Sequence, residues 1–122
     1  YRDKGVVWLT ISSSAEGKQG FLADATAAKK RYQEEKSQAD YLLIDSEGTI
    51  GKLYEAKVTP HMFVISSKGT IAYNGAIDSI ASASSDDIAK SEKYLAQALD
   101  QQLAGKKVAM AKTKPYGCSV KY

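Results

Sequence analysis

The chain has 122 residues, of which 43% are hydrophobic and 25% are charged, and its net charge is +3. This length suffices for one domain with its own core, and the composition is typical of a soluble globular protein. No apolar run is long enough for a transmembrane helix, and no segment has a signal-peptide pattern. The single cysteine, Cys118, and the single histidine, His61, exclude an intrachain disulfide, a CxxC pair and a multi-histidine metal site, so we expect no metal and no cofactor.

The first half of the sequence alternates between strand and helix patterns. Residues 5–12 form an apolar, β-branched run that predicts a strand buried on both faces, with Trp8 in the core. Residues 18–37 show helical spacing, and residues 41–44 predict a short strand. The predicted inner face of that helix consists of Phe21, Ala25, Ala28 and Tyr32.

A short helix and a hairpin follow. Residues 49–55 predict a helix or turn with Leu53 and Tyr54 facing inward. Pro60 has no backbone N–H and therefore belongs at a strand entrance. The apolar run 62–65, a turn containing Gly69, and a returning strand from residue 70 complete the hairpin.

The last predicted element is a helix over residues 87–104, preceded by a polar loop over 77–87 and ended by Gly105. Its candidate N-caps are Ser84, Ser85, Asp86 and Asp87. Its predicted apolar stripe consists of Ile88, Leu95, Leu99 and Leu103. The element order β-α-β-(short α)-β-β-α predicts an α/β domain.

Residues 106–122 form a basic segment with five Lys and no acidic residue. Such a segment is compatible with binding to nucleic acid or to an acidic surface. It lacks the interleaved Arg and aromatic residues of nucleic-acid sites, so we expect a solvated tail and no nucleic-acid partner.

Several motifs occur together in a fixed order along the chain. They are Lys4-Gly5-Val6-Val7-Trp8-Leu9, Leu43-Ile44-Asp45 with Gly48, Thr59-Pro60-His61-Met62-Phe63-Val64-Ile65, Tyr73 with Gly75-Ala76-Ile77-Asp78, and Tyr116-Gly117-Cys118-Ser119-Val120-Lys121-Tyr122. In order and spacing this set resembles the thioredoxin-like redoxins, in the branch related to the peroxiredoxins.

The resemblance implies a partial thioredoxin-like fold with a central mixed β-sheet flanked by helices. It also implies an N-terminally incomplete redoxin domain over residues 1–105, followed by the tail 106–122 that carries Cys118. In that family a strand and a cysteine-bearing helix precede the segment matched by residues 5–12, and nothing here corresponds to them. We therefore expect a longer parent chain, with the family's intervening strand between residues 5–12 and 61–66.

The resemblance also assigns an active-site loop to Thr59, Pro60 and His61, with Pro60 in the cis form. For His61 two roles stay open, a proton shuttle and a structural hydrogen-bonding residue at the base of the hairpin. For Cys118 three stay open: a resolving cysteine, a lone reactive thiol helped by Lys114 and Lys121, and an inert small residue. Asp78 is interpreted as a loop cap.

Three functional hypotheses follow. The first is a redoxin-type thiol-disulfide oxidoreductase or peroxiredoxin-like antioxidant domain whose nucleophilic cysteine lies outside this chain. Its partner would be a thiol, disulfide or peroxide substrate. The second is a non-catalytic thioredoxin-like binding module, and the third is a fragment that forms homo-oligomers through exposed strand edges. No membrane partner is expected, and the sequence does not decide between a cytoplasmic and an exported location.

Overall fold

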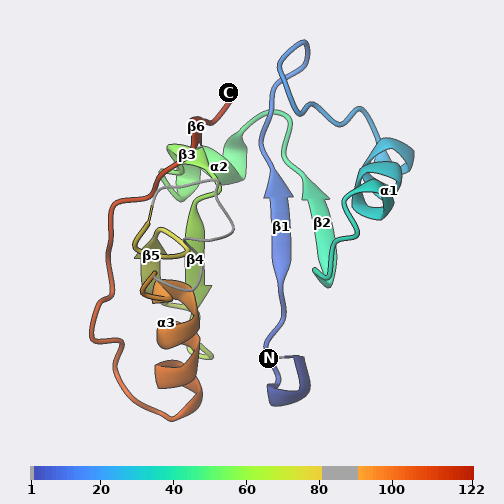
Figure 1. The fold of residues 1–122 in the computed structure, drawn as a ribbon. Helices are drawn as coiled ribbons and strands as arrows, with labels where there is room; N and C mark the ends of the chain where they lie inside the picture. Colours follow the sequence, from blue (N-terminus) through green and yellow to red (C-terminus); the bar gives the residue numbers. More distant parts are fainter. Residues whose placement is uncertain (1, 81–90) are drawn as a thin grey trace. The chain divides into compact units, whose positions relative to one another are not determined.

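The computed structural model describes residues 2–80 and 91–122, and the chain divides into two compact units. Unit 1 comprises Tyr1–Ala56 and Val120–Tyr122, and unit 2 comprises Lys57–Ser119. Short helices and strands occur in both units (Figure 1), which confirms the α/β class. The chain thus leaves unit 1 once and returns to it with its last three residues.

Unit 1 is built around a parallel strand pair. The strands β1 (Leu9–Ser12) and β2 (Tyr41–Ile44) pair from Leu9 opposite Tyr41 to Ser12 opposite Ile44. Two parallel strands need a crossover connection, and α1 (Ala25–Glu34) supplies it. A short 3₁₀ helix, η1 (Arg2–Lys4), precedes β1, and α2 (Thr49–Leu53) follows β2.

The burial predicted for the first strand was wrong. Val7 is 63% exposed, Trp8 is 51% exposed and Leu9 is 50% exposed, so Trp8 is not a core residue. The strand is also shorter than predicted, because residues 5–8 do not enter the ladder. Instead, the backbone N–H of Trp8 donates to the Asp40 carboxylate at 2.7 Å, so a side chain takes the place of a strand partner.

The two helices of unit 1 are shorter than their sequence patterns predicted. Asp24 caps α1 by accepting from the Ala27 N–H at 2.9 Å, so the helix begins seven residues later than expected and Phe21 precedes it. In α2 the inward orientation predicted for Leu53 was wrong, since this side chain is 76% exposed. Tyr54, just after α2, is half-buried as expected.

Unit 2 contains the predicted hairpin and a second, unpredicted strand pair. The strands β4 (Met62–Ile65) and β5 (Ile71–Gly75) are antiparallel, and Gly69 takes a positive φ of 82° in their turn. The strands β3 (Val58–Thr59) and β6 (Cys118–Ser119) form the other antiparallel pair. In the described part of the chain the strands therefore form three two-stranded sheets, not the one central mixed sheet that the resemblance implied.

The helix α3 (Tyr94–Leu103) ends as predicted, with Gly105 at a positive φ of 71°. Its beginning differs, because the helix starts at Tyr94 rather than at residue 87. The candidate N-caps Ser84, Ser85, Asp86 and Asp87, together with Ile88, lie outside the described residues. Leu95 and Leu99 pack on the core, whereas Leu103 is 41% exposed and is not part of the stripe.

Residues 106–119 are packed onto unit 2, which differs from the solvated tail predicted. Val108 is 5% exposed and joins Val64, Tyr73 and Ala98 in the core. Further along, the Asn74 N–H donates to the Ala111 carbonyl at 2.9 Å, and the Thr113 N–H donates to the Asn74 carbonyl at 3.1 Å. The segment thus occupies the edge of β5 that faces away from β4.

Candidate functional site

The predicted site residues Cys118 and Thr59 are brought together by the pairing of β3 with β6. Cys118 lies directly opposite Thr59 in this antiparallel ladder, and Val58 lies opposite Ser119. Residues opposite each other in such a pair have Cα atoms about 4.5–5.5 Å apart and side chains on the same face. The exposed Cys118 is thereby placed beside the loop of Thr59, Pro60 and His61, 57 or more positions earlier in the sequence.

The geometry of this pairing depends on Gly117. A Cβ at position 117 would lie 2.1 Å from the Thr59 carbonyl oxygen and 3.3 Å from the Pro60 nitrogen, so no larger residue fits. The φ of Gly117 is 141°, a value that favours glycine. The Thr59–Pro60 peptide bond is cis, which confirms the isomer predicted for it.

His61 is held by hydrogen bonds at both ring nitrogens. Nδ1 accepts from the Lys57 backbone N–H at 3.2 Å, and Nε2 lies 2.5 Å from Oδ1 of Asn74. An amide oxygen can only accept, so this geometry matches the tautomer that carries its proton on Nε2. The ring also stacks on Phe63, with centroids 4.5 Å apart. Because both nitrogens are engaged, this arrangement favours the structural role of His61 over the proton shuttle.

Asp78 caps a loop, as interpreted from the sequence, and also binds the C-terminal segment. Its Oδ1 accepts from the Ile80 N–H at 3.2 Å and from the hydroxyl of Tyr116. The hydrogen bond to Asp78, with burial and the charge of Asp78 adding to it, raises the pKa of Tyr116 to about 12. Tyr116 is two residues before Cys118, so this contact ties the approach to β6 onto unit 2.

A second polar cluster, the Asp45 node, lies in unit 1. The buried Asp45 carboxylate accepts from the Ser13 hydroxyl at 2.7 Å, from the Gly51 N–H at 2.8 Å and from the Ile50 N–H at 3.1 Å. Burial acts to raise the pKa of Asp45, but these hydrogen bonds outweigh it, so the pKa lies below its usual value. The node fixes the start of α2 and contains no predicted site residue.

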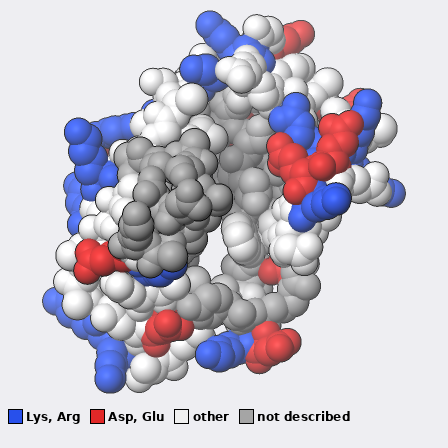
Figure 2. Space-filling view, viewed as in Figure 1, with Lys and Arg blue, Asp and Glu red and all other residues white. Residues whose placement is uncertain are grey.

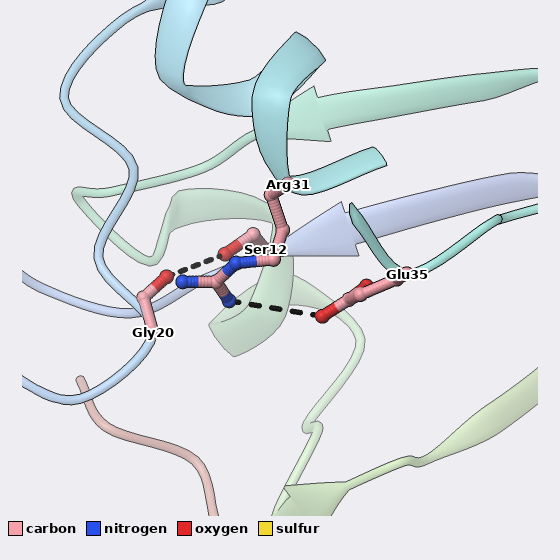
Figure 3. A network of polar contacts seen from close by, with 4 residues as sticks. All are labelled: Ser12, Gly20, Arg31 and Glu35. Carbon is pink, nitrogen blue, oxygen red and sulfur yellow. Dashed lines mark hydrogen bonds and ion pairs between the residues drawn. The ribbon is translucent and has the colours of Figure 1, made fainter. Parts of the chain in front are cut away.

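The face of α1 carries charges of both signs and a shallow pocket. Basic and acidic side chains are interspersed over this helix (Figure 2). Lys30 pairs with Glu34 at 3.9 Å, and Arg31 pairs with Glu35 at 3.8 Å. Figure 3 shows the Arg31–Glu35 pair together with the hydrogen bond from Ser12 to the Gly20 carbonyl. The pocket holds about 210 Å³ and is lined by Phe21, Leu22, Ala27, Lys30, Arg31 and Glu34, so it too contains no predicted site residue.

Within residues 2–80 and 91–122, no three His, Cys, Asp or Glu side chains are grouped so that they could hold a metal ion. Over the same ranges no helix is long and apolar enough to span a membrane.

Comparison with known proteins finds solved structures with the same fold, but their descriptions name no function. No protein-family model and no curated protein matches the chain. Two solved structures share its fold: a hypothetical protein from Sinorhizobium meliloti 1021, with a TM-score of 0.81, and an uncharacterized conserved protein from Geobacillus kaustophilus, with a TM-score of 0.83. Each is 24% identical over the whole of this chain, which spans 64% and 62% of their respective lengths. The chain is therefore an α/β protein with a fold found in longer proteins whose functions their descriptions do not state.

Sequence reasoning missed two residues that shape the site. Asn74 is the next-to-last residue of β5, and asparagine is disfavoured in strands. Its side chain orients His61, and its backbone binds the C-terminal segment. Gly117 precedes the only cysteine, and the close approach to Thr59 requires it. An asparagine within a strand and a glycine beside a lone cysteine were the available signals.

Proposed function

We propose that this chain is part of a redoxin-type thiol-disulfide oxidoreductase, with a thioredoxin-like fold, in which Cys118 is the resolving thiol. The observation that carries the proposal is the pairing of Cys118 with Thr59, next to Pro60 and His61. The redoxin motifs in the sequence assign these three loop residues to the face of the protein where sulfur chemistry occurs. A thiol at this place is exposed and can reach a disulfide bound along the loop.

The chemistry requires a second cysteine sulfur, and this sequence contains one cysteine. The Cys118 thiol loses its proton to solvent, and the thiolate attacks one sulfur of a disulfide held by another cysteine. The old S–S bond breaks, its electron pair leaves on the departing thiolate, and a new disulfide joins Cys118 to the attacked sulfur. The electrons balance without any added cofactor.

The loop gives this reaction a preference for extended peptides. Thr59 and Cys118 are both exposed beside the bend at Pro60, so a peptide that carries the disulfide can lie along this surface of the loop. His61 and Asn74 hold the loop in place from the hairpin side. We therefore expect a cysteine-containing peptide in a mixed disulfide to react faster than a small disulfide does.

The test uses a cysteine peptide whose sulfur is bonded to the chromophore 5-thio-2-nitrobenzoate. Attack by Cys118 releases one coloured thiolate per chain, and Cys118→Ser abolishes this release. The matched control is the same chain unfolded in urea, which has the same thiol but no loop. We expect the folded chain to react about tenfold faster with the peptide than the unfolded chain, and equal rates would contradict the proposal.

A second assay defines the limits of the activity. Mixed with hydrogen peroxide and a reductant, this chain should consume peroxide no faster than a free thiol does, because a resolving thiol lacks an activated site for the first attack. Rapid turnover that disappears in Cys118→Ser would make Cys118 the primary nucleophile and overturn its assignment as the resolving thiol.

Exposed apolar side chains favour self-association as a second candidate function. In unit 1, Val7, Trp8 and Tyr41 are 63%, 51% and 59% exposed on or beside the β1–β2 pair. Contacts between such surfaces of two chains would bury them. Light scattering over a concentration series tests this, since a mass that stays at 13.2 kDa contradicts it.

A further inference from the structure

Residues 117–122 are held at several points along their length. Gly117 lies against the backbone of Thr59, and Cys118 and Ser119 form β6. The Lys121 carbonyl accepts from the Ala15 N–H at 2.7 Å. Tyr122 then completes the attachment within unit 1.

Tyr122 lies on two glycines that leave space for its ring. A Cβ at Gly48 would come within 2.7 Å of the ring, and a Cβ at Gly51 would come within 2.8 Å of the hydroxyl. The hydroxyl donates to the Ala56 carbonyl at 2.6 Å, and the Lys52 ammonium lies 5.4 Å from the ring centroid. Packing, a hydrogen bond and a cation–π contact therefore hold Tyr122.

The β3–β6 ladder needs such an anchor. It contains two residue pairs, and a two-stranded ladder of this size is marginal in water by itself. Only Ser119, Val120 and Lys121 separate Cys118 from Tyr122. At about 3.3–3.6 Å per residue, the Cα of Cys118 stays within roughly 14 Å of the place where Tyr122 is anchored in unit 1. Release of Tyr122 removes that limit and leaves the hydrogen bond between the Lys121 carbonyl and the Ala15 N–H as the attachment next to β6, so β6 frays more easily.

We propose that Tyr122 is a positioning residue for Cys118: its anchor on Gly48, Gly51 and Ala56 keeps the thiol opposite Thr59. This inference deepens the proposed function and rests on it, because the position of Cys118 matters only if the thiol reacts there. Tyr122 takes no part in the sulfur chemistry itself. It acts through the three residues that join it to Cys118.

The experiment measures the proximity of positions 59 and 118 without any activity assay. In Thr59→Cys, the new thiol and Cys118 are directly opposite in an antiparallel pair, a spacing that a disulfide can bridge. Equilibration with glutathione exchanges this disulfide for one oxidised glutathione and two protein thiols. The equilibrium constant gives the effective concentration of one thiol at the other.

The expected order of effects identifies the anchor. In the Thr59→Cys background, Tyr122→Ala should lower the effective concentration at least tenfold, and Tyr122→Phe, which loses only the bond to Ala56, should lower it about threefold. Tyr41→Ala is the matched control, since Tyr41 is an exposed tyrosine of unit 1 outside the anchor, and it should change nothing. An unchanged value in both Tyr122 variants would overturn the proposal. If Tyr122→Ala does not fold, the Tyr122→Phe result alone decides.

The two proposals fail in distinguishable ways. If the effective concentration falls as expected but the folded chain shows no preference for the peptide disulfide, the anchor is established and the redoxin function is wrong. If the peptide preference is present in the wild-type chain and persists in Tyr122→Ala, the function stands and the anchor is unnecessary.

Discussion

The two units fill their interiors in different ways. In unit 2 the core is apolar and is built by four separate segments, which contribute Val64, Tyr73, Ala98 and Val108. Among the described residues of unit 1 the buried apolar side chains are Leu22, Ala28 and Ala39, two of them alanines, and the charged side chain of Asp45 is buried as well. Unit 1 thus depends more on directed hydrogen bonds, whereas unit 2 depends more on packing, and the two should respond to different kinds of substitution.

The largest expected effect is in the unit 2 core. Tyr73 is fully buried, and its hydroxyl donates to the Ala76 carbonyl at 2.5 Å and lies 2.6 Å from the Thr113 hydroxyl. Tyr73→Ala should cost about 4 kcal/mol, since it empties the volume of a large side chain. Native-state hydrogen exchange of the β5 amides measures this cost within unit 2.

The exposed Tyr41 of unit 1 is the matched control for that substitution. Tyr41→Ala should change the stability by less than about 0.5 kcal/mol. Equal losses of stability in Tyr73→Ala and Tyr41→Ala would show that burial of Tyr73 in the unit 2 core does not stabilise the protein.

The second prediction concerns the Asp45 node. Asp45→Ala should destabilise unit 1 by about 3 kcal/mol, because three donors lose a charged acceptor and two of them are backbone groups at the start of α2. Fluorescence of Trp8, the only tryptophan, reports on unit 1 during urea unfolding. Glu47→Gln, at an exposed neighbouring position, is the control and should have little effect.

The same node predicts an acid dependence. The folded-state pKa of Asp45 is lowered, so its contribution is fully present above the unfolded value of about 3.9 and is lost as the pH falls through the folded value. Between about pH 5 and about pH 2, unit 1 of the wild-type chain should therefore lose more stability than unit 1 of Asp45→Ala does. Parallel acid profiles for the two proteins would remove Asp45 as the cause.

The third prediction tests the link between the C-terminal segment and the loop. Gly117→Ala would place a Cβ 2.1 Å from the Thr59 carbonyl oxygen and should cost about 2 kcal/mol by separating β6 from β3. Gly69→Ala is the control, because Gly69 has a similar need for positive φ but nothing within 4 Å of its Cβ. Its cost should be about 1 kcal/mol. A Gly117→Ala protein in which the hydrogen-bonded amides of the β3–β6 pair keep their protection from exchange would contradict the close approach.

How far the sequence predicted this structure also differs between the units. The hairpin of unit 2 was predicted well because its signals are local: a proline entrance, an apolar run over residues 62–65 and Gly69 in the turn. In unit 1 the apolar run 5–12 predicted burial that is absent, since a run of this kind does not reveal how many neighbours a strand has. Trp8 is the clearest case, because its N–H bonds to Asp40 instead of to a strand.

The residues of the candidate site were named from the sequence, but the strand pairing that brings them together was not predicted. Thr59, Pro60, His61 and Cys118 were all named from the sequence. Their meeting depends on the β3–β6 pair, which spans nearly 60 residues and involves strands of two residues each. Such short strands have no periodicity to detect, and the basic composition of residues 106–122 suggested solvation instead.

The smallest expected effect lies where the C-terminal segment meets Asp78. Tyr116→Phe removes the hydroxyl that donates to this carboxylate and should cost unit 2 about 1 kcal/mol at neutral pH. The folded-state pKa of Tyr116 is raised to about 12, so its contribution is fully present below the unfolded value of about 10 and is lost as the pH rises through 12. The stabilities of the wild type and Tyr116→Phe should therefore converge between pH 10 and 12. Hydrogen exchange cannot be read easily in that range, so urea midpoints from circular dichroism provide the measurement. Curves that keep a constant separation up to pH 12 would show that the hydroxyl acts by packing and not through the proton it shares with Asp78.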